Sequence, residues 1–78
     1  MYYSESEEYN IKIGDIVVSI DDDRYIRLRK GDVYEVLKII PAYETGWGEI
    51  VPEFYNVREV STGREDIYRA WHFRKREE

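Results

Sequence analysis

Residues 30–41 read Lys-Gly-Asp-Val-Tyr-Glu-Val-Leu-Lys-Ile-Ile-Pro. The residues between the Lys-Gly-Asp turn and the proline are rich in β-branched and aromatic side chains, which favour a β-strand. Pro41 ends the strand because proline has no N–H to donate to a neighbouring strand. The phase of this strand is ambiguous from the pattern; the phase we favour places Tyr34 and Val36 in the core, with a slip or bulge before Ile39.

Shorter runs of the same kind lie on both sides of this stretch. On the N-terminal side, Ile16, Val18 and Ile20 share one face of a period-two strand, which ends at consecutive aspartates. On the C-terminal side, Ser-Thr-Gly-Arg at residues 61–64 predicts a tight hairpin turn. No run shows the periodicity of a substantial helix, so the sequence predicts an all-β domain. Besides residues 33–40, strands are expected at residues 15–20, 50–60, 65–69 and 71–73.

The order of these elements resembles the SH3-like small barrel, in particular its prokaryotic and phage versions. Two segments carry the resemblance, Ile13-Gly14-Asp15-Ile16-Val17-Val18 and Lys30-Gly31-Asp32-Val33-Tyr34-Glu35-Val36. The resemblance implies a five-stranded barrel over residues 11–73. The motifs with which eukaryotic members bind proline-rich peptides are absent, so the resemblance assigns no functional residue. Residues 1–10 are expected to form a flexible acidic arm, and residues 74–78 a frayed charged tail.

Composition limits the kind of protein this can be. The chain has 78 residues, is 42% hydrophobic and 37% charged, and carries a formal net charge of −5. A chain of this length forms one small domain with a thin core. Because cysteine is absent, disulfides, thiolate ligands and a cysteine nucleophile are excluded. The N-terminus lacks the basic and apolar regions of a signal peptide, and no apolar run could span a membrane, so we expect a cytoplasmic protein of a prokaryote or of a phage-infected host.

Catalytic chemistry has little basis in this sequence. His72 is the only histidine, and the alternating strand predicts that it is exposed between Trp71 and Phe73 in the core. No Ser-His-Asp order, metal-binding histidine pair or phosphate-binding glycine loop is present. The aspartates at residues 21–23 lack the spacing of a calcium loop. We therefore expect no enzymatic activity, no cofactor and no metal site.

An aromatic groove is the main candidate site. Tyr25 lies in a predicted loop at residues 21–31, and Tyr43 and Trp47 lie in a second loop at residues 41–49. In a small barrel these two loops flank one groove, and tyrosine and tryptophan are effective anchors for a partner. Negative charge on Asp21, Asp22 and Asp23 would steer a basic partner, and Arg27 and Arg29 would make rim contacts. These features predict a non-catalytic protein-binding module, such as a phage or mobile-element accessory protein that docks on a host protein.

Two alternatives stay open at this point. In the first, a basic ribbon binds RNA or DNA with Tyr25 stacking on a base. In the second, the carboxylates of residues 5–23 and 44–66 imitate a nucleic-acid backbone and occupy the DNA site of a host protein, which requires them to line one face. Oligomeric state is also open, because the edges at residues 11–13 and 50–55 could pair between copies. The basic ribbon consists of Arg24, Arg27, Arg29 and Lys30.

Overall fold

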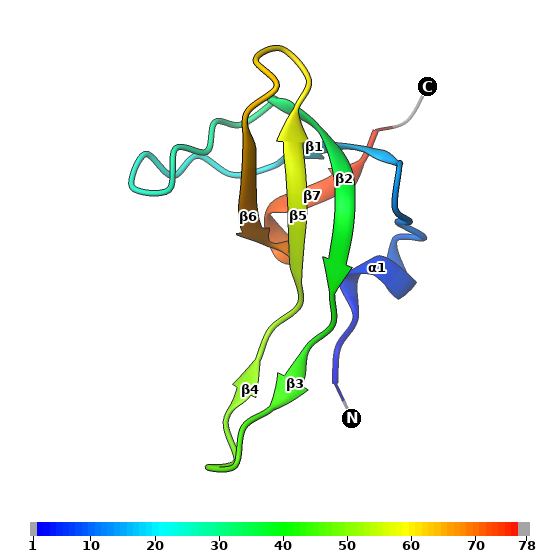
Figure 1. Cartoon of the computed structure of the whole chain (residues 1–78), viewed down its shortest axis with the longest axis vertical. Coiled ribbons are helices and arrows are strands. Elements are labelled where there is room, and N and C mark those ends of the chain that lie inside the picture. The colour runs from blue at the N-terminus through cyan, green and yellow to red at the C-terminus, as the bar shows by residue number, and fades with distance from the viewer. Residues whose placement is uncertain (1, 77–78) are drawn as a thin grey trace.

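The computed structural model describes residues 2–76, in which five strands form one antiparallel sheet (Figure 1). Their spatial order is β6-β5-β2-β1-β7, while two further strands pair only with each other. The domain is therefore mostly β-structure, as predicted. The sheet strands are β1 (Ile16–Ser19), β2 (Val33–Ile40), β5 (Phe54–Glu59), β6 (Glu65–Arg69) and β7 (Phe73–Lys75). The remaining elements are the one-turn helix α1 (Glu5–Glu8), the hairpin strands β3 (Tyr43–Glu44) and β4 (Ile50–Val51), and the 3-10 turn η1 (Ala70–His72).

The sheet bends around the core, but the strands described in residues 2–76 do not close into a barrel. Its edge strands β6 and β7 stand at opposite ends of the strand order, and η1 joins them along the chain. In Figure 1, β7 passes behind β5. The Phe73 ring at the start of β7 lies 6.1 Å from the Tyr55 ring and 6.0 Å from the Tyr68 ring. The sequence thus predicted the five-stranded antiparallel sheet correctly. The predicted closure into a barrel is not observed, because β6 and β7 do not pair with each other within residues 2–76.

Strand β2 has the phase that the sequence predicts. Tyr34 and Val36 are fully buried, and the pairing of β2 with β5 shifts register between Val36 and Lys38. This irregularity is the bulge expected before Ile39. Because a bulge changes which side of the strand faces inward, Ile39 packs against the core from an odd-numbered position.

Strand β1 buries the face opposite to its predicted isoleucine face. Val17 and Ser19 are 0% and 1% exposed, whereas Ile20 is 37% exposed. The Ser19 hydroxyl can be buried because it donates to the carbonyl of Asp21 at 2.9 Å. Ile16 and Val18 on the opposite face are half-buried, so β1 carries apolar side chains on both faces and polarity alone does not mark the core side.

The end of the chain departs from the predicted closing strand at residues 71–73. A 3-10 turn occupies the first two of these positions, and β7 starts only at Phe73. The turn directs Ala70 and Phe73 inward and leaves Trp71 41% exposed. The core prediction for Phe73 is therefore confirmed, and the core prediction for Trp71 is wrong.

Two further expectations for this region also change. The side chain of His72 is not exposed, because its Nδ1 lies 2.9 Å from Asp21 Oδ2 and the ring is largely covered. Residues 74 and 75 of the predicted frayed tail belong to β7, which pairs with β1. Residues 77 and 78 of that tail lie outside the described residues.

Aromatic rings dominate the core. Phe73 lies at its centre, with the Tyr34 ring at 5.4 Å in an edge-to-face arrangement. Edge-to-face pairs of this kind add to the free energy gained by burying the rings. The buried hydrophobic residues are Ile11, Val17, Leu28, Tyr34, Val36, Tyr55, Val57, Tyr68, Ala70 and Phe73.

The N-terminal segment, which we expected to be a flexible arm, lies against the sheet in the structure. Helix α1 begins after an N-cap serine, Ser4. The Ser4 hydroxyl, the Ser6 hydroxyl and the Ser6 N–H donate to the carboxylate of Glu53 at 3.1, 3.0 and 2.9 Å. The guanidinium of Arg74 stacks 4.1 Å from the centroid of the Tyr9 ring. Contacts with residues remote in sequence therefore hold the segment in place.

The buried tyrosines predict a loss of stability in alkali. Burial raises the pKa of Tyr34, Tyr55 and Tyr68, and that of Tyr68 rises to about 12, from an ordinary value of 10.0. Each folded-state pKa lies above the unfolded value. The contribution of these uncharged tyrosines to stability is therefore complete below pH 10 and falls as the pH rises above it. We expect the free energy of unfolding to fall by up to about 1.4 kcal/mol per pH unit for each tyrosine. Urea unfolding from neutral to alkaline pH measures this slope.

A conservative variant checks the cause of that loss. The Tyr55 hydroxyl is buried and has no hydrogen-bond partner among residues 2–76. Tyr55→Phe removes its titration at almost constant shape, so the slope in alkali should be shallower than in the parent chain. A parent stability that stays constant above pH 10 would contradict this account.

Candidate partner-binding surfaces

The aromatic residues predicted to share one groove lie in separate parts of the structure. Tyr25 belongs to the 21–31 loop, whereas Tyr43 and Trp47 belong to the β3–β4 hairpin, residues 43–51. Figure 1 shows this hairpin extending from one end of the sheet, away from the loop between β1 and β2. The expected groove between the two loops does not form, because residues 43–51 pair with themselves and do not fold back over the sheet.

A compact turn holds the tip of the β3–β4 hairpin. The N–H of Thr45 donates to the carbonyl of Glu49 at 2.8 Å, and the Thr45 hydroxyl accepts from the N–H groups of Trp47 and Glu49, each at 3.3 Å. Gly48 has a φ of 81°, a conformation that glycine adopts without steric cost. The turn thus fixes the backbone of Trp47 while its side chain points into solvent.

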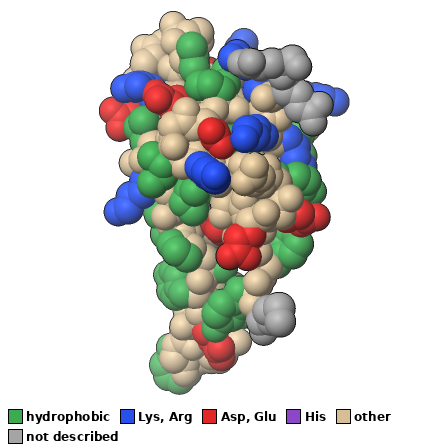
Figure 2. Space-filling view, turned by 90° about the vertical axis from the view of Figure 1, so that its right-hand side faces the viewer, with side chains coloured by type: hydrophobic (Ala, Val, Ile, Leu, Met, Phe, Trp, Pro, Cys, Tyr) green, Lys and Arg blue, Asp and Glu red, His purple; other side chains and the backbone are tan. Residues whose placement is uncertain are grey.

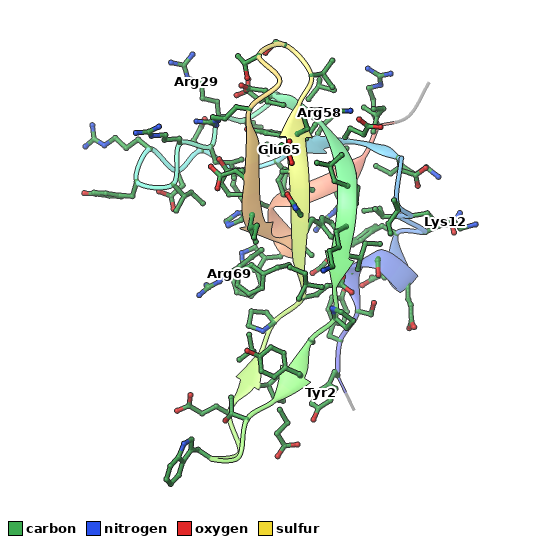
Figure 3. All side chains as sticks on the ribbon, in the orientation of Figure 1. Tyr2, Lys12, Arg29, Arg58, Glu65 and Arg69 are labelled. Atoms are coloured by element: carbon green, nitrogen blue, oxygen red, sulfur yellow. The ribbon has the colours of Figure 1, made fainter. Side chains whose placement is uncertain are left out.

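Large apolar side chains cover this hairpin. Trp47 is 92% exposed, Ile50 57% and Tyr43 53%. Tyr2 lies beside the hairpin, and its hydroxyl donates to Glu44 Oε2 at 2.8 Å (Figure 3). In the space-filling view, hydrophobic side chains gather along the tapered lower part of the molecule (Figure 2). Apolar groups left in water on a projecting element gain free energy when a partner covers them.

A small apolar cleft lies at the base of the hairpin, next to η1. Its volume is about 140 Å³. Trp71 forms one wall, and the guanidinium of Arg69 stacks 4.8 Å from the centroid of its ring. The residues that line the cleft are Tyr3, Glu5, Ala42, Ile50, Pro52, Glu53 and Trp71.

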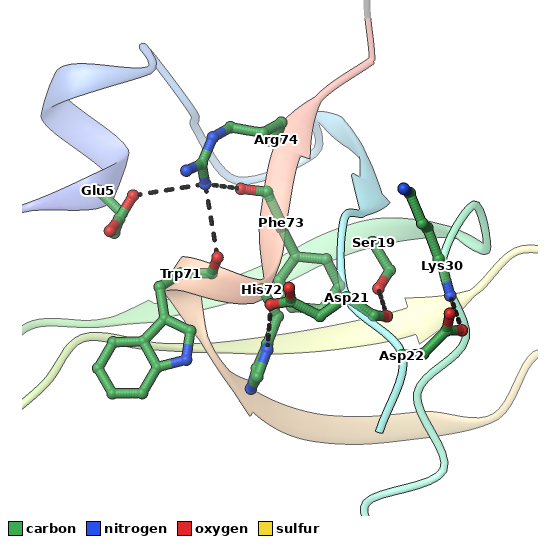
Figure 4. Close-up of polar contacts among 9 residues, drawn as sticks. All are labelled: Glu5, Ser19, Asp21, Asp22, Lys30, Trp71, His72, Phe73 and Arg74. Carbon is green, nitrogen blue, oxygen red and sulfur yellow. Dashed lines mark hydrogen bonds and ion pairs between the residues drawn. The ribbon is translucent and has the colours of Figure 1, made fainter. Parts of the chain in front are cut away.

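The aspartates at residues 21–23 all form contacts within the chain, and Figure 4 shows those of Asp21 and Asp22. Asp21 Oδ2 lies 2.9 Å from His72 Nδ1. The N–H of Lys30 donates to Asp22 Oδ1 at 2.8 Å, and the N–H of Tyr25 donates to Asp23 Oδ1 at 3.0 Å. Sequence reasoning assigned these carboxylates to a partner and missed their role in shaping the 21–31 loop, for which aspartates that accept backbone N–H groups are well suited.

The same loop presents its basic side chains outward. Leu28 is buried and Ile26 packs against the core. Arg24, Arg27 and Arg29 are exposed, and within residues 2–76 none of them lies within ion-pair distance of a carboxylate. The basic residues of the loop are thus available for contact with a ligand.

The acidic residues do not form an uninterrupted surface. Glu5 lies 3.7 Å from Arg74, and Asp15 lies 3.5 Å from Lys75. Acidic and basic side chains also alternate over the face drawn in Figure 2. This distribution gives no support to the alternative in which the chain imitates a nucleic-acid backbone.

Comparison with protein-family models, curated protein sequences and solved structures finds no match for this chain. Residues 2–76 contain no group of three or more histidine and carboxylate side chains that could hold a metal ion. Within the same part of the chain, no helix has the length and apolar character needed to cross a membrane.

Sequence reasoning also missed Glu53 and Arg64. Glu53 is 5% exposed, although it lies between Pro52 and Phe54 in what looked like a strand. Its partners Ser4 and Ser6 are more than forty residues away along the chain, so no local pattern marks the contact. Arg64 follows a glycine in a turn, where an arginine usually signals only a solvated loop.

Proposed function

We propose that this chain is a non-catalytic protein-binding module that docks through its β3–β4 hairpin. The observation that supports this most directly is the tryptophan at the tip, which is 92% exposed on a hydrogen-bonded turn. A tryptophan on a fixed backbone loses little conformational entropy on binding and buries a large area. Tyr43 and Ile50 extend the contact along the hairpin, so a partner with an apolar pocket fits this element.

We propose the SH3-like small barrel as the fold type of this module, in a version whose two edge strands, β6 and β7, do not pair with each other within residues 2–76. The order of the connections supports the resemblance. A long loop follows β1, a segment with two glycines follows β2, and a tight hairpin turn joins β5 to β6. The final strand β7 returns to pair with β1. In this proposal the β3–β4 hairpin is an elaboration of the loop that follows the second strand of the sheet.

Partner capture with hairpin variants tests the proposal. We expect tagged parent chain to retain a discrete protein from nuclease-treated bacterial lysate. In Tyr43→Ala/Trp47→Ala, the affinity for this protein should fall by about 700-fold or more and its retention should be lost, since central aromatic anchors contribute about 2 kcal/mol or more each. Both side chains lie outside the core, so urea unfolding of the double variant should match that of the parent.

Tyr25→Ala is a matched control for this experiment. Tyr25 is 90% exposed, about as much as Trp47, but lies on the other loop. Its removal should leave capture by the hairpin unchanged. Equal capture by the parent and the hairpin double variant, or loss in Tyr25→Ala alone, would refute docking through the hairpin.

A further inference from the structure

A second cleft lies between the 21–31 loop and the turn that joins β5 to β6. Its volume is about 910 Å³, within the range of ligand sites. Arg64 ties the two walls together, because its Nη2 donates to the carbonyl of Arg27 at 3.4 Å and to the Tyr68 hydroxyl at 3.3 Å. The lining residues are Asp22, Asp23, Arg24, Arg27, Leu28, Arg29, Asp32, Glu59, Ser61, Thr62 and Arg64. We name this site the arginine cleft.

The arginine cleft presents donors that have no partner in the chain. Arg24, Arg27 and Arg29 are exposed and lack a carboxylate within ion-pair distance among residues 2–76. The Nε of Arg64 is buried and makes no hydrogen bond within this part of the chain. Guanidinium groups bind phosphate oxygens through two parallel hydrogen bonds, so a row of them suits a ligand that carries several phosphates.

The loop is built to hold these arginines in place. Asp22 and Asp23 each accept a backbone N–H of the loop, and Asp23 and Leu28 exchange backbone hydrogen bonds at 2.8 and 2.9 Å. Arg27 has a φ of 59°, which a non-glycine residue adopts only when its surroundings fix the backbone. The side chains at residues 24–29 therefore project from a fixed frame.

Tyr25 adds an aromatic surface next to the arginines. Its side chain is 90% exposed, and its N–H is bound to Asp23 Oδ1 at 3.0 Å. Binding proteins for single-stranded nucleic acids combine basic side chains along the backbone with aromatic rings on which bases stack. The neighbouring carboxylates of Asp32 and Glu59 can accept hydrogen bonds from base N–H groups, which a ligand made only of anionic groups lacks.

We propose that the arginine cleft binds single-stranded nucleic acid. Phosphates contact Arg24, Arg27 and Arg29, and a base stacks on Tyr25. The net charge of −5 disfavours a duplex, which would bring a long row of phosphates near the acidic parts of the chain. A single strand can contact the cleft without approaching those acidic parts. Its phosphates release counterions when they bind the arginines, so the affinity is sensitive to salt.

Fluorescence anisotropy with labelled oligo-dT and oligo-U tests this inference. We expect binding by the parent chain whose logarithmic affinity falls with the logarithm of salt at a slope of about −2, as three phosphate contacts on a single strand predict. In Arg27→Ala/Arg29→Ala, the slope should become shallower by about 1.4. Tyr25→Ala should weaken binding by about tenfold without changing the slope, because stacking releases no counterions.

Arg76→Ala is the control for general charge, since Arg76 is exposed, lies outside the arginine cleft and carries half the charge that Arg27→Ala/Arg29→Ala removes. It should change both affinity and slope little. All the substituted side chains are exposed, so urea unfolding should confirm that each variant is folded. The hairpin variant Tyr43→Ala/Trp47→Ala should bind the oligonucleotides like the parent, which keeps this test independent of the proposed protein partner.

Three results would overturn the inference. The first is absence of oligonucleotide binding by the parent at about 50 mM salt, where phosphate contacts are strong. The second is a change of slope in Arg76→Ala that is half or more of the change in Arg27→Ala/Arg29→Ala, which would show attraction by general charge. The third is cosedimentation with phosphatidylserine vesicles without oligonucleotide binding, which would assign the arginines to a membrane surface.

Discussion

Replacing Phe73 by alanine is expected to lower the free energy of unfolding by about 3–5 kcal/mol, the usual cost of removing a buried aromatic ring. Phe73 is fully buried, and its ring contacts those of Tyr34, Tyr55 and Tyr68. The substitution leaves a cavity among rings from three different strands, so no single strand can shift to fill it. A small domain has a free energy of unfolding near the low end of about 5–15 kcal/mol. The substitution should therefore remove most of the stability of the folded state. Urea unfolding followed by circular dichroism measures the change.

Trp71→Ala is the informative comparison, because Trp71 lies in η1, only two residues before Phe73, but is exposed. Its ring is 41% exposed and contacts the guanidinium of Arg69. Loss of partial burial and of one cation–π contact should cost less than about 1.5 kcal/mol. A larger loss of unfolding free energy for Trp71→Ala than for Phe73→Ala would show that Trp71, and not Phe73, is the core side chain at this turn.

The difference between these two residues shows which parts of the fold could be predicted from the sequence. Strand β2 has the inward phase and the bulge that the sequence favoured, although the run at residues 33–40 does not alternate strictly and left the phase ambiguous. At residues 70–73 the pattern Ala-Trp-His-Phe fits a strand as well as a 3-10 turn. Local preference does not separate the two, and the turn is needed to bring β7 from β6 across to β1.

The candidate sites were predictable only in part, for a related reason. Exposed aromatic and basic residues could be identified from their positions in loops, and Trp47, Tyr25 and Arg27 are indeed exposed. Their grouping depends on the direction in which each loop extends. The pairing of β3 with β4 moves Trp47 away from Tyr25, whereas Arg64 from a distant turn joins the basic residues of the 21–31 loop. Such groupings arise from tertiary structure and have no local signature.

Glu53→Ala is the second substitution expected to have a large effect, because this one carboxylate holds the N-terminal segment. It is 5% exposed and accepts three hydrogen bonds from Ser4 and Ser6. The substitution leaves these donors without acceptors. Hydrogen bonds to a charged group contribute about 1.5–3 kcal/mol, so we expect a loss of about 2–4 kcal/mol in the free energy of unfolding.

The location of this loss distinguishes the contact from a general weakening of the core. The N–H of Ile11 donates to the carbonyl of Ser6 at 2.8 Å, and the N–H of Tyr9 donates to Glu5 at 3.0 Å. Hydrogen exchange at these two amides should become faster in Glu53→Ala than at amides of β2 and β5, since the segment can then open without the sheet. Glu49→Ala, at an exposed glutamate of the β3–β4 hairpin, should change stability by less than about 0.5 kcal/mol.

Unchanged exchange at residues 9 and 11 would contradict this assignment and leave Arg74 as the main contact. Arg74 stacks on Tyr9 and lies 3.7 Å from Glu5, but its side chain is 36% exposed, so solvent weakens that ion pair. The hydrogen bonds to Glu53 are more shielded and anchor the start of α1. Because Glu53 also lines the apolar cleft beside Trp71, release of the segment would uncover part of the surface from which the β3–β4 hairpin projects.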